Sequence, residues 1–191
     1  MLAPEAAAAL STREGHRPGA AHGNLVHMFV LGIDPGLTVT GYGLVRRTRT
    51  LEAVAAGIIR TDPASDTSAR LLHLYRLLSA LIVEHKPEVV AIEQVFTNRN
   101  RRSAIGVGRA AGVAMLAAAE SGLKVHEYVP TMVKSAITGD GRADKSAVQR
   151  MVALRLGLAD PPRPVDAADA LAVALCHIQS LAAALDRVGA T

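Results

Sequence analysis

Two short apolar runs in this chain each end in an acidic residue, and this pattern limits how the chain can fold. The first run, 28–33, is followed by Asp34 and the turn pair Pro35-Gly36, and the second, 89–92, is followed by Glu93. Apolar runs of this length are typical of buried strands. A carboxylate at the end of a buried strand is costly unless its lost hydration is compensated, and a hard divalent cation is a common partner. The two runs therefore predict a metal site where strands end.

Two further acids lie on a strongly helical segment near the C-terminus. Asp166 and Asp169 are three residues apart, which places both side chains on one face of a helix. Each acid also has a structural interpretation: Asp34 as a turn residue, Glu93 as the partner of a nearby arginine, and Asp166 as a helix cap. Asp169 is harder to explain in this way, because the helix around it is otherwise apolar. We favour one shared site for the four acids.

The remaining pattern predicts a single α/β domain. Three strands joined by turns form an antiparallel meander, and the later alternation of helix and strand adds parallel strands, which gives a mixed sheet flanked by helices. Gly41 and Gly43 within the second strand indicate that another part of the backbone approaches it closely. We expect strands at 29–33, 39–46, 51–60, 88–93 and 124–128, and helices at 66–86, 103–120, 131–137, 145–156 and 164–186.

Composition narrows the class of protein further. The chain has 191 residues and a formal net charge of +4, which favours an acidic partner. The single cysteine, Cys176, excludes an internal disulfide and a Cys-based zinc site, and it suits a reducing cytoplasm. We see no apolar stretch approaching the ~20 residues of a membrane span. We expect residues 1–27 to be a disordered or non-native extension, 28–182 the domain, and 183–191 a tail.

Four motifs occur in a fixed order along the chain: Leu31-Gly-Ile-Asp-Pro-Gly36 with Thr40-Gly-Tyr-Gly43, Ala91-Ile-Glu-Gln-Val-Phe96, the basic region formed by 128–134 with Asp144-Lys-Ser146, and Asp166-Ala-Ala-Asp-Ala-Leu171. In this order they resemble the RuvC family of Holliday-junction endonucleases in the ribonuclease H-like superfamily. The resemblance extends from residue 28 to about residue 179, and it implies a ribonuclease H-like fold with a five-stranded mixed sheet. It also implies cleavage of Holliday junctions by paired symmetric nicks in DNA recombination and repair.

The resemblance implies that Asp34, Glu93, Asp166 and Asp169 are all catalytic and all metal ligands. Phosphodiester hydrolysis needs an activated water and a neutralised leaving oxygen, and two Mg²⁺ ions ~3.5–4 Å apart supply both. We expect two Mg²⁺ per site, with Mn²⁺ as a possible substitute. Asp34 is the expected bridging ligand because a strand end holds it rigidly, whereas Asp166 is the acid whose place water most readily takes. The division of the four acids between the two metals stays open.

The residues expected to contact DNA follow Glu93 or lie in the basic region. No acid occurs between residues 95 and 119, and this stretch carries arginines that we expect to guide phosphates to the site, namely Arg99, Arg101 and Arg102. By resemblance, Phe96 stacks on unpaired bases near the junction, and Lys134 and Lys145 lie near the scissile phosphate. Alternatively, Phe96 packs under its own loop, and the two lysines belong to a solvated helix surface.

The expected partners are four-way junction DNA, a second copy of the chain and, by resemblance, a branch-migration motor. Two symmetric nicks require two sites, which a two-fold dimer supplies. The Ala- and Gly-rich helix 103–120 is either the dimer interface or a helix packed closely on its own sheet. Two other functions are alternatives to a junction endonuclease. An ATP-binding phosphotransferase also has an Asp-x-Gly turn after its first strand, and a non-catalytic junction-binding module would keep the fold without the chemistry.

Overall fold

The computed structural model describes residues 27–94 and 101–189, which form five strands and five helices. Every expected element is present, and α2 and α5 extend beyond their predicted bounds. The strands are β1 (Met28–Asp34), β2 (Val39–Arg47), β3 (Leu51–Arg60), β4 (Val89–Glu93) and β5 (Lys124–Tyr128). The helices are α1 (Thr67–His85), α2 (Arg101–Glu120), α3 (Pro130–Thr138), α4 (Lys145–Arg155) and α5 (Val165–Gly189).

The strands form one mixed sheet in the order β3-β2-β1-β4-β5. The first three strands pair antiparallel, and β4 runs parallel to both β1 and β5. The expected five-stranded mixed sheet is therefore confirmed. The register pairs Ile33 with Ile92, so that β1 and β4 end side by side. This pairing brings the two strand-ending acids to the same edge of the sheet.

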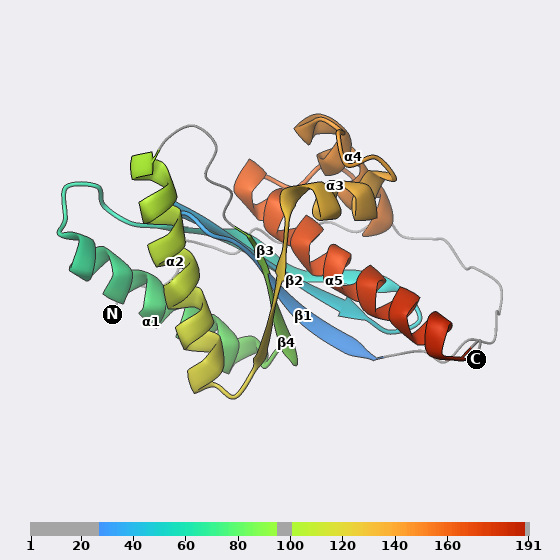
Figure 1. Cartoon of the computed structure of the whole chain (residues 1–191), viewed down its shortest axis with the longest axis horizontal. Coiled ribbons are helices and arrows are strands. Elements are labelled where there is room, and N and C mark those ends of the chain that lie inside the picture. The colour runs from blue at the N-terminus through green and yellow to red at the C-terminus, as the bar shows by residue number, and fades with distance from the viewer. Residues whose placement is uncertain (1–26, 95–100, 190–191) are drawn as a thin grey trace.

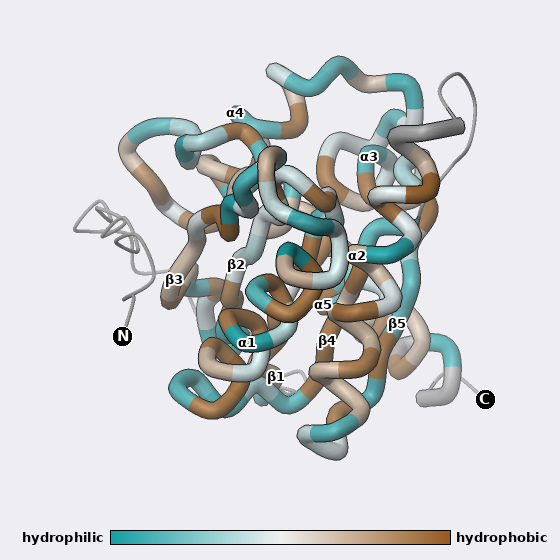
Figure 2. The backbone as a smooth tube through the Cα atoms, turned by 90° about the vertical axis from the view of Figure 1, so that its left-hand side faces the viewer, coloured by the Kyte–Doolittle hydropathy of each residue, from teal (hydrophilic) through white to brown (hydrophobic). Residues whose placement is uncertain are grey.

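Helices cover both faces of the sheet, with α1 and α2 on one face and α5, α3 and α4 on the other (Figure 1). Successive residues of a strand point to opposite faces, so β1 contributes to two cores. Val30 packs with α5 residues such as Leu171, whereas Leu31 packs with α1 residues such as Leu74. Hydrophobic residues follow β4 and α5 through the middle of the molecule (Figure 2). The strands nearest the predicted site are thus buried on both faces.

Glycines on β1 and β2 let α5 lie directly against the sheet. A Cβ atom added at Gly41 would lie 2.0 Å from the carbonyl oxygen of Asp166, and one at Gly32 would lie 2.1 Å from that of Ala170. At Gly43 the added atom would lie 2.8 Å from the backbone nitrogen of Leu171. The close backbone approach predicted at Gly41 and Gly43 is confirmed, and it sets the first turns of α5 over the end of β1.

The apolar character of α5 follows from this packing. Residues Val165–Leu185 are long and apolar enough to cross a membrane by length and composition, with a hydropathy of 1.6, and this is the one such segment among the residues described. The prediction that no apolar stretch approaches this length is therefore wrong. However, 56% of that window is buried inside the protein. Because α5 packs on all five strands and on α3 and α4, its composition is that of a core helix.

A buried histidine lies on α5, far from the acids along the helix. The side chain of His177 is 5% exposed, and its Nδ1 lies 2.7 Å from the hydroxyl oxygen of Tyr128. The His126 ring is its second neighbour, with 4.7 Å between ring centroids. Burial, and next the charge of His126, lower the pKa of His177 to about 4. The fold therefore holds this imidazole in its neutral form at neutral pH.

We expect the protein to lose stability as the pH falls from 6.5, the ordinary pKa of histidine, toward about 4. In that window the unfolded chain binds a proton at His177 and the fold does not, so protonation favours unfolding. Each pKa unit corresponds to about 1.4 kcal/mol, which limits the loss to roughly 3 kcal/mol. Urea unfolding of His177→Gln should depend less on pH than unfolding of the parent, with His73→Gln as the control. An unchanged pH dependence in His177→Gln would contradict the assignment.

Candidate active site

Three of the four predicted acids meet at one edge of the sheet. Asp34 ends β1, Glu93 ends the parallel neighbour β4, and Asp169 lies near the start of α5. Gly32 faces α5, and because alternate strand residues share a face, Asp34 faces α5 as well. All three side chains are partly buried, and that of Asp169 is 14% exposed. The predicted convergence of these acids is therefore what the fold produces.

The acids disfavour one another's ionised form. Burial, followed by the charges of Glu93 and Asp169, raises the pKa of Asp34 from its ordinary 3.8 to about 8. Burial and then the charge of Asp169 also raise the pKa of Glu93, while a hydrogen bond between the Glu93 and Asp34 carboxyl groups acts in the opposite direction. A cluster of this kind is stabilised by positive charge placed among its oxygens.

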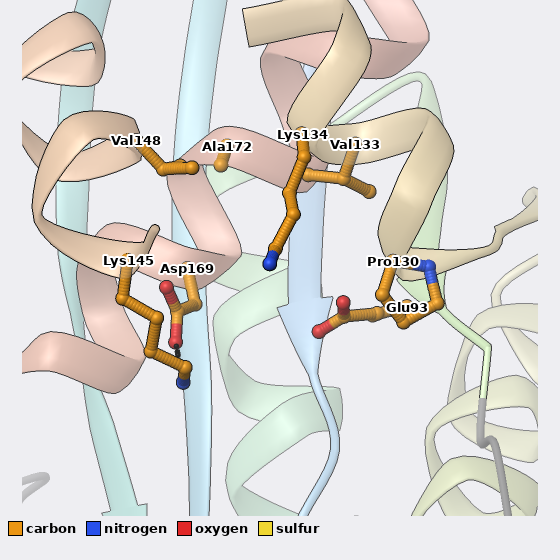
Figure 3. Close-up of a pocket in the computed structure, with 8 residues that line it drawn as sticks. All are labelled: Glu93, Pro130, Val133, Lys134, Lys145, Val148, Asp169 and Ala172. Atoms are coloured by element: carbon orange, nitrogen blue, oxygen red, sulfur yellow. Dashed lines mark hydrogen bonds and ion pairs between the residues drawn. The ribbon is translucent and has the colours of Figure 1, made fainter. Parts of the chain in front are cut away.

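Two lysines supply part of that positive charge (Figure 3). The Lys145 ammonium donates a hydrogen bond to Asp169 Oδ2 at 2.9 Å, and this bond raises the pKa of Lys145. The Lys134 side chain extends from α3 toward the space between Glu93 and Asp169, and its charge lowers the pKa of Glu93. Together with Pro130, Val133, Val148 and Ala172, these four charged residues line one pocket.

Asp166 lies one turn before Asp169 and is set apart from this pocket. Its charge contributes to the raised pKa of Asp34, but after those of Glu93 and Asp169. Its backbone, rather than its carboxylate, makes the close contact with Gly41. Asp166 is thus the most peripheral of the four acids.

The donor set fits hard divalent cations, which prefer carboxylate oxygens. Within residues 27–94 and 101–189, no three His, Cys, Asp or Glu side chains are yet placed to hold one ion. Asp169 is paired with Lys145 through its Oδ2 atom. A cation placed among these acids would compete with Lys145 for this oxygen.

Comparison with known proteins assigns the family. The family model described as crossover junction endodeoxyribonuclease RuvC matches residues 30–177. The chain belongs to the RuvC family. The RuvC of Salinispora arenicola is 49% identical over 168 residues, covering 84% of this chain and 96% of that protein. The RuvC of Moorella thermoacetica is 50% identical over 151 residues, covering 78% and 90%.

Solved RuvC structures share the fold. The T. thermophilus RuvC in complex with a Holliday junction substrate superposes with a TM-score of 0.77 at 37% identity, covering 81% of this chain and 95% of that one. The expected ribonuclease H-like class is therefore confirmed. Membership of the RuvC family also rules out the alternative of an ATP-binding phosphotransferase.

The residues expected to contact DNA are placed only in part in this RuvC chain. Lys134 and Lys145 line the pocket beside the acids, and the Lys145 side chain is 71% exposed. Arg101 and Arg102 lie in the first turn of α2, but their side chains are outside the described part. Phe96 and Arg99 fall entirely outside the described residues.

A group of polar residues around the turn that follows Asp34 was not predicted from the sequence. Thr40, Thr61 and Arg70 make hydrogen bonds to the turn that follows β1. A threonine flanked by glycine inside a buried strand, as at Thr40, is the one sequence signal that could have indicated such a role.

Proposed function

We propose that this protein cuts four-way DNA junctions by metal-dependent hydrolysis at Asp34, Glu93 and Asp169, with Asp166 as the fourth acid. The observation that supports this best is the Asp34 carboxyl, whose pKa is raised to about 8 by burial and the surrounding acids. A divalent cation relieves this arrangement. Membership of the RuvC family supports the substrate, since a relative has been solved with a Holliday junction bound.

Each side chain is assigned a role from its position in the site. When bound here, two Mg²⁺ ions, or Mn²⁺ in their place, would activate the attacking water and neutralise the leaving 3′ oxygen. Asp34, Glu93 and Asp169 would hold these ions, and Asp34 is well suited to this role because it ends a central strand of the sheet. If a cation took the place of Lys145 at Asp169 Oδ2, the Lys145 ammonium would be free to contact a phosphate oxygen. Lys134, on the other side of the pocket, is proposed to hold the same phosphate.

Nicking of a mobile four-way junction tests the proposal. We expect two symmetric nicks in Mg²⁺ or Mn²⁺, no nicks in EDTA, and little cleavage of a linear duplex of the same sequence. Cleavage that persists in EDTA would contradict the metal site. Equal cleavage of junction and duplex would contradict the junction specificity, and binding without cleavage would favour the non-catalytic module.

The proposed DNA path continues from the pocket toward the start of α2. Phosphates are strongly anionic, so the cluster Arg99, Arg101 and Arg102 would guide the strand toward the acids. Phe96 precedes this cluster and is the proposed stacking residue for an unpaired base. Lys134 and Lys145 support this direction, because both present ammonium groups at the acid-lined pocket.

We further propose that a second copy of the chain binds the outer face of α2. The inner face carries buried Ala110 and Ala114, which pack toward the sheet. On the opposite side, Gly108 and Gly112 have nothing in the described structure within 4 Å of where a Cβ would lie. Ile105 and Leu116 on this side are 55% and 60% exposed. Gly108 and Gly112 therefore do not serve packing on the chain's own sheet, and they leave room for a close helix–helix contact.

Leu116→Glu is expected to convert the proposed dimer into monomers, because it places a charge on this apolar face. The dissociation constant measured by analytical ultracentrifugation should rise at least about tenfold, since a buried unpaired charge costs more than 1.4 kcal/mol. Junctions should then receive single rather than paired nicks. Leu154→Glu is the control, because Leu154 is 72% exposed on α4, away from α2. A Leu116→Glu protein that stays dimeric would exclude this interface.

Two other expectations stay at the level of the family. A branch-migration motor is the proposed partner by family resemblance, and no described surface is assigned to it. A cytoplasmic location is proposed from the single cysteine, Cys176, which is buried and forms no disulfide.

A further inference from the structure

The turn that follows Asp34, residues 35–38, is held by an unusual share of the buried polar side chains. In the described parts of the chain only three polar or charged residues are buried: Thr40, Thr61 and His177. Thr40 is 1% exposed and Thr61 is 7% exposed, and both direct their hydroxyl groups at this turn. Buried hydroxyls are costly without partners, so this placement indicates that the turn must be held in one position.

The two threonines form hydrogen bonds to different residues of the turn. The Thr40 hydroxyl donates to the Gly36 carbonyl at 2.6 Å and accepts from the Gly36 amide at 3.3 Å, which closes the turn on itself. The Thr61 hydroxyl donates to the Leu37 carbonyl at 2.5 Å, and the Thr61 amide donates to the Thr38 carbonyl at 3.0 Å. Thr61 follows β3 directly, so these bonds tie the tip of the turn to the edge of the sheet.

Arg70 on α1 completes the attachment. Its Nε donates to the Thr61 hydroxyl at 2.8 Å, and its Nη2 donates to the Thr38 hydroxyl at 2.9 Å. A planar guanidinium can span two acceptors in this way, whereas a lysine ammonium cannot reproduce the geometry. Within the described residues Arg70 forms no ion pair with a carboxylate. Its hydrogen bonds are therefore committed to the turn.

This attachment fixes the backbone beside an expected metal ligand. Asp34 ends β1 and immediately precedes the turn. The turn is bounded on one side by Thr61 and Arg70, and on the other by α2, where a Cβ at Gly106 would lie 3.4 Å from Leu37 Cβ. The backbone next to Asp34 is thus held from three elements.

We propose that Thr61 and Arg70 are positioning residues that hold Asp34 in its metal-binding place. This inference rests on the proposed metal site. The two side chains act through the backbone of the turn and touch neither metal nor DNA. Residues that support metal ligands in this indirect way typically contribute about 10–100-fold to metal affinity or activity.

The test measures Mn²⁺ affinity of the metal-free protein by the electron paramagnetic resonance signal of free Mn²⁺, beside turnover and junction affinity in EDTA. Thr61→Val keeps the shape of the side chain but loses its hydroxyl, and Arg70→Met loses both guanidinium bonds. Each should weaken Mn²⁺ binding about tenfold and lower kcat, with junction affinity within about twofold of the parent. Arg70→Lys should resemble Arg70→Met, because charge alone does not restore the two bonds.

Matched variants separate positioning from other effects. Thr61→Ser keeps the hydroxyl and should stay close to the parent. Arg76→Met removes the same charge from an exposed position on α1 and should change nothing. Thr38→Val removes only one bond at an exposed residue, so it gives a milder loss of Mn²⁺ affinity even if Thr61→Val folds poorly.

Two results would overturn the proposal. If Arg70→Met and Thr61→Val bind Mn²⁺ like the parent, the turn needs no such support. If Arg70→Met instead weakens only junction binding and reduces its salt dependence by about one phosphate contact, Arg70 binds DNA. Asp34→Asn serves as the reference: if it also binds Mn²⁺ normally, the proposed metal site itself fails. If Asp34→Asn alone loses Mn²⁺, only the positioning role fails.

Discussion

Asp34→Asn is expected to abolish junction cleavage and leave junction binding intact. Asparagine keeps the size of the side chain but removes the charge that would bridge two cations. Residues behind a metal ligand already contribute about 10–100-fold, so loss of the ligand itself should lower kcat by more than about 100-fold. Single-turnover cleavage in Mg²⁺ and fluorescence anisotropy in EDTA measure the two quantities separately.

Companion substitutions place this result within the acid cluster. Glu93→Gln and Asp169→Asn should behave like Asp34→Asn, because each removes one of the proposed metal ligands. Asp166→Asn should be the mildest of the four, since the charge of Asp166 acts on Asp34 less than those of Glu93 and Asp169 and its place can be taken by water. Normal cleavage by Asp34→Asn would show that the metals are held elsewhere.

Asp34→Asn should also be more stable than the parent protein when metal is absent. The pKa of Asp34 rises from 3.8 to about 8 in the fold, so between these values the fold holds a proton that the unfolded chain releases. Stability of the parent therefore falls as the pH rises through this window. Each unit corresponds to about 1.4 kcal/mol, so the loss reaches several kcal/mol by pH 8. In EDTA the Tm of Asp34→Asn should exceed that of the parent at pH 8 and approach it at pH 4. Equal Tm values at pH 8 would refute the raised pKa of Asp34.

Much of the site is predictable because strand geometry is local and regular. Asp34 and Glu93 each end an apolar run, and parallel pairing of β1 with β4 aligns those ends. The close approach at Gly41 also has a local signal, because glycine inside a strand marks a place where another backbone comes near. The prediction that no apolar stretch approaches the length of a membrane span was wrong for α5, and it too was based on a local pattern. The apolar length of α5 reflects burial on the sheet, and composition alone does not separate this from a membrane span.

The side-chain contacts around the acids have no such signal in the sequence. The Lys145–Asp169 pair depends on how α3 and α4 fold back over α5, which loop geometry decides. The bonds from Arg70 to Thr38 and Thr61 join three separate elements, and each residue alone is an ordinary polar residue of a helix or loop. Side-chain networks of this kind depend on tertiary packing rather than on periodicity.

Gly41→Ala tests whether the placement of α5 on the sheet controls the site. The added methyl group would lie 2.0 Å from the Asp166 carbonyl oxygen, a backbone atom that cannot rotate away. The first turns of α5 must therefore shift away from β2, and Asp166 and Asp169 move with them. Overpacking of a core costs about 1–3 kcal/mol, which should appear as a lower Tm. Mn²⁺ affinity and cleavage should fall further than this loss explains, when measured well below the Tm. If Gly41→Ala lowers Tm but binds Mn²⁺ like the parent, the distance between α5 and β2 matters for folding and not for the arrangement of the acids.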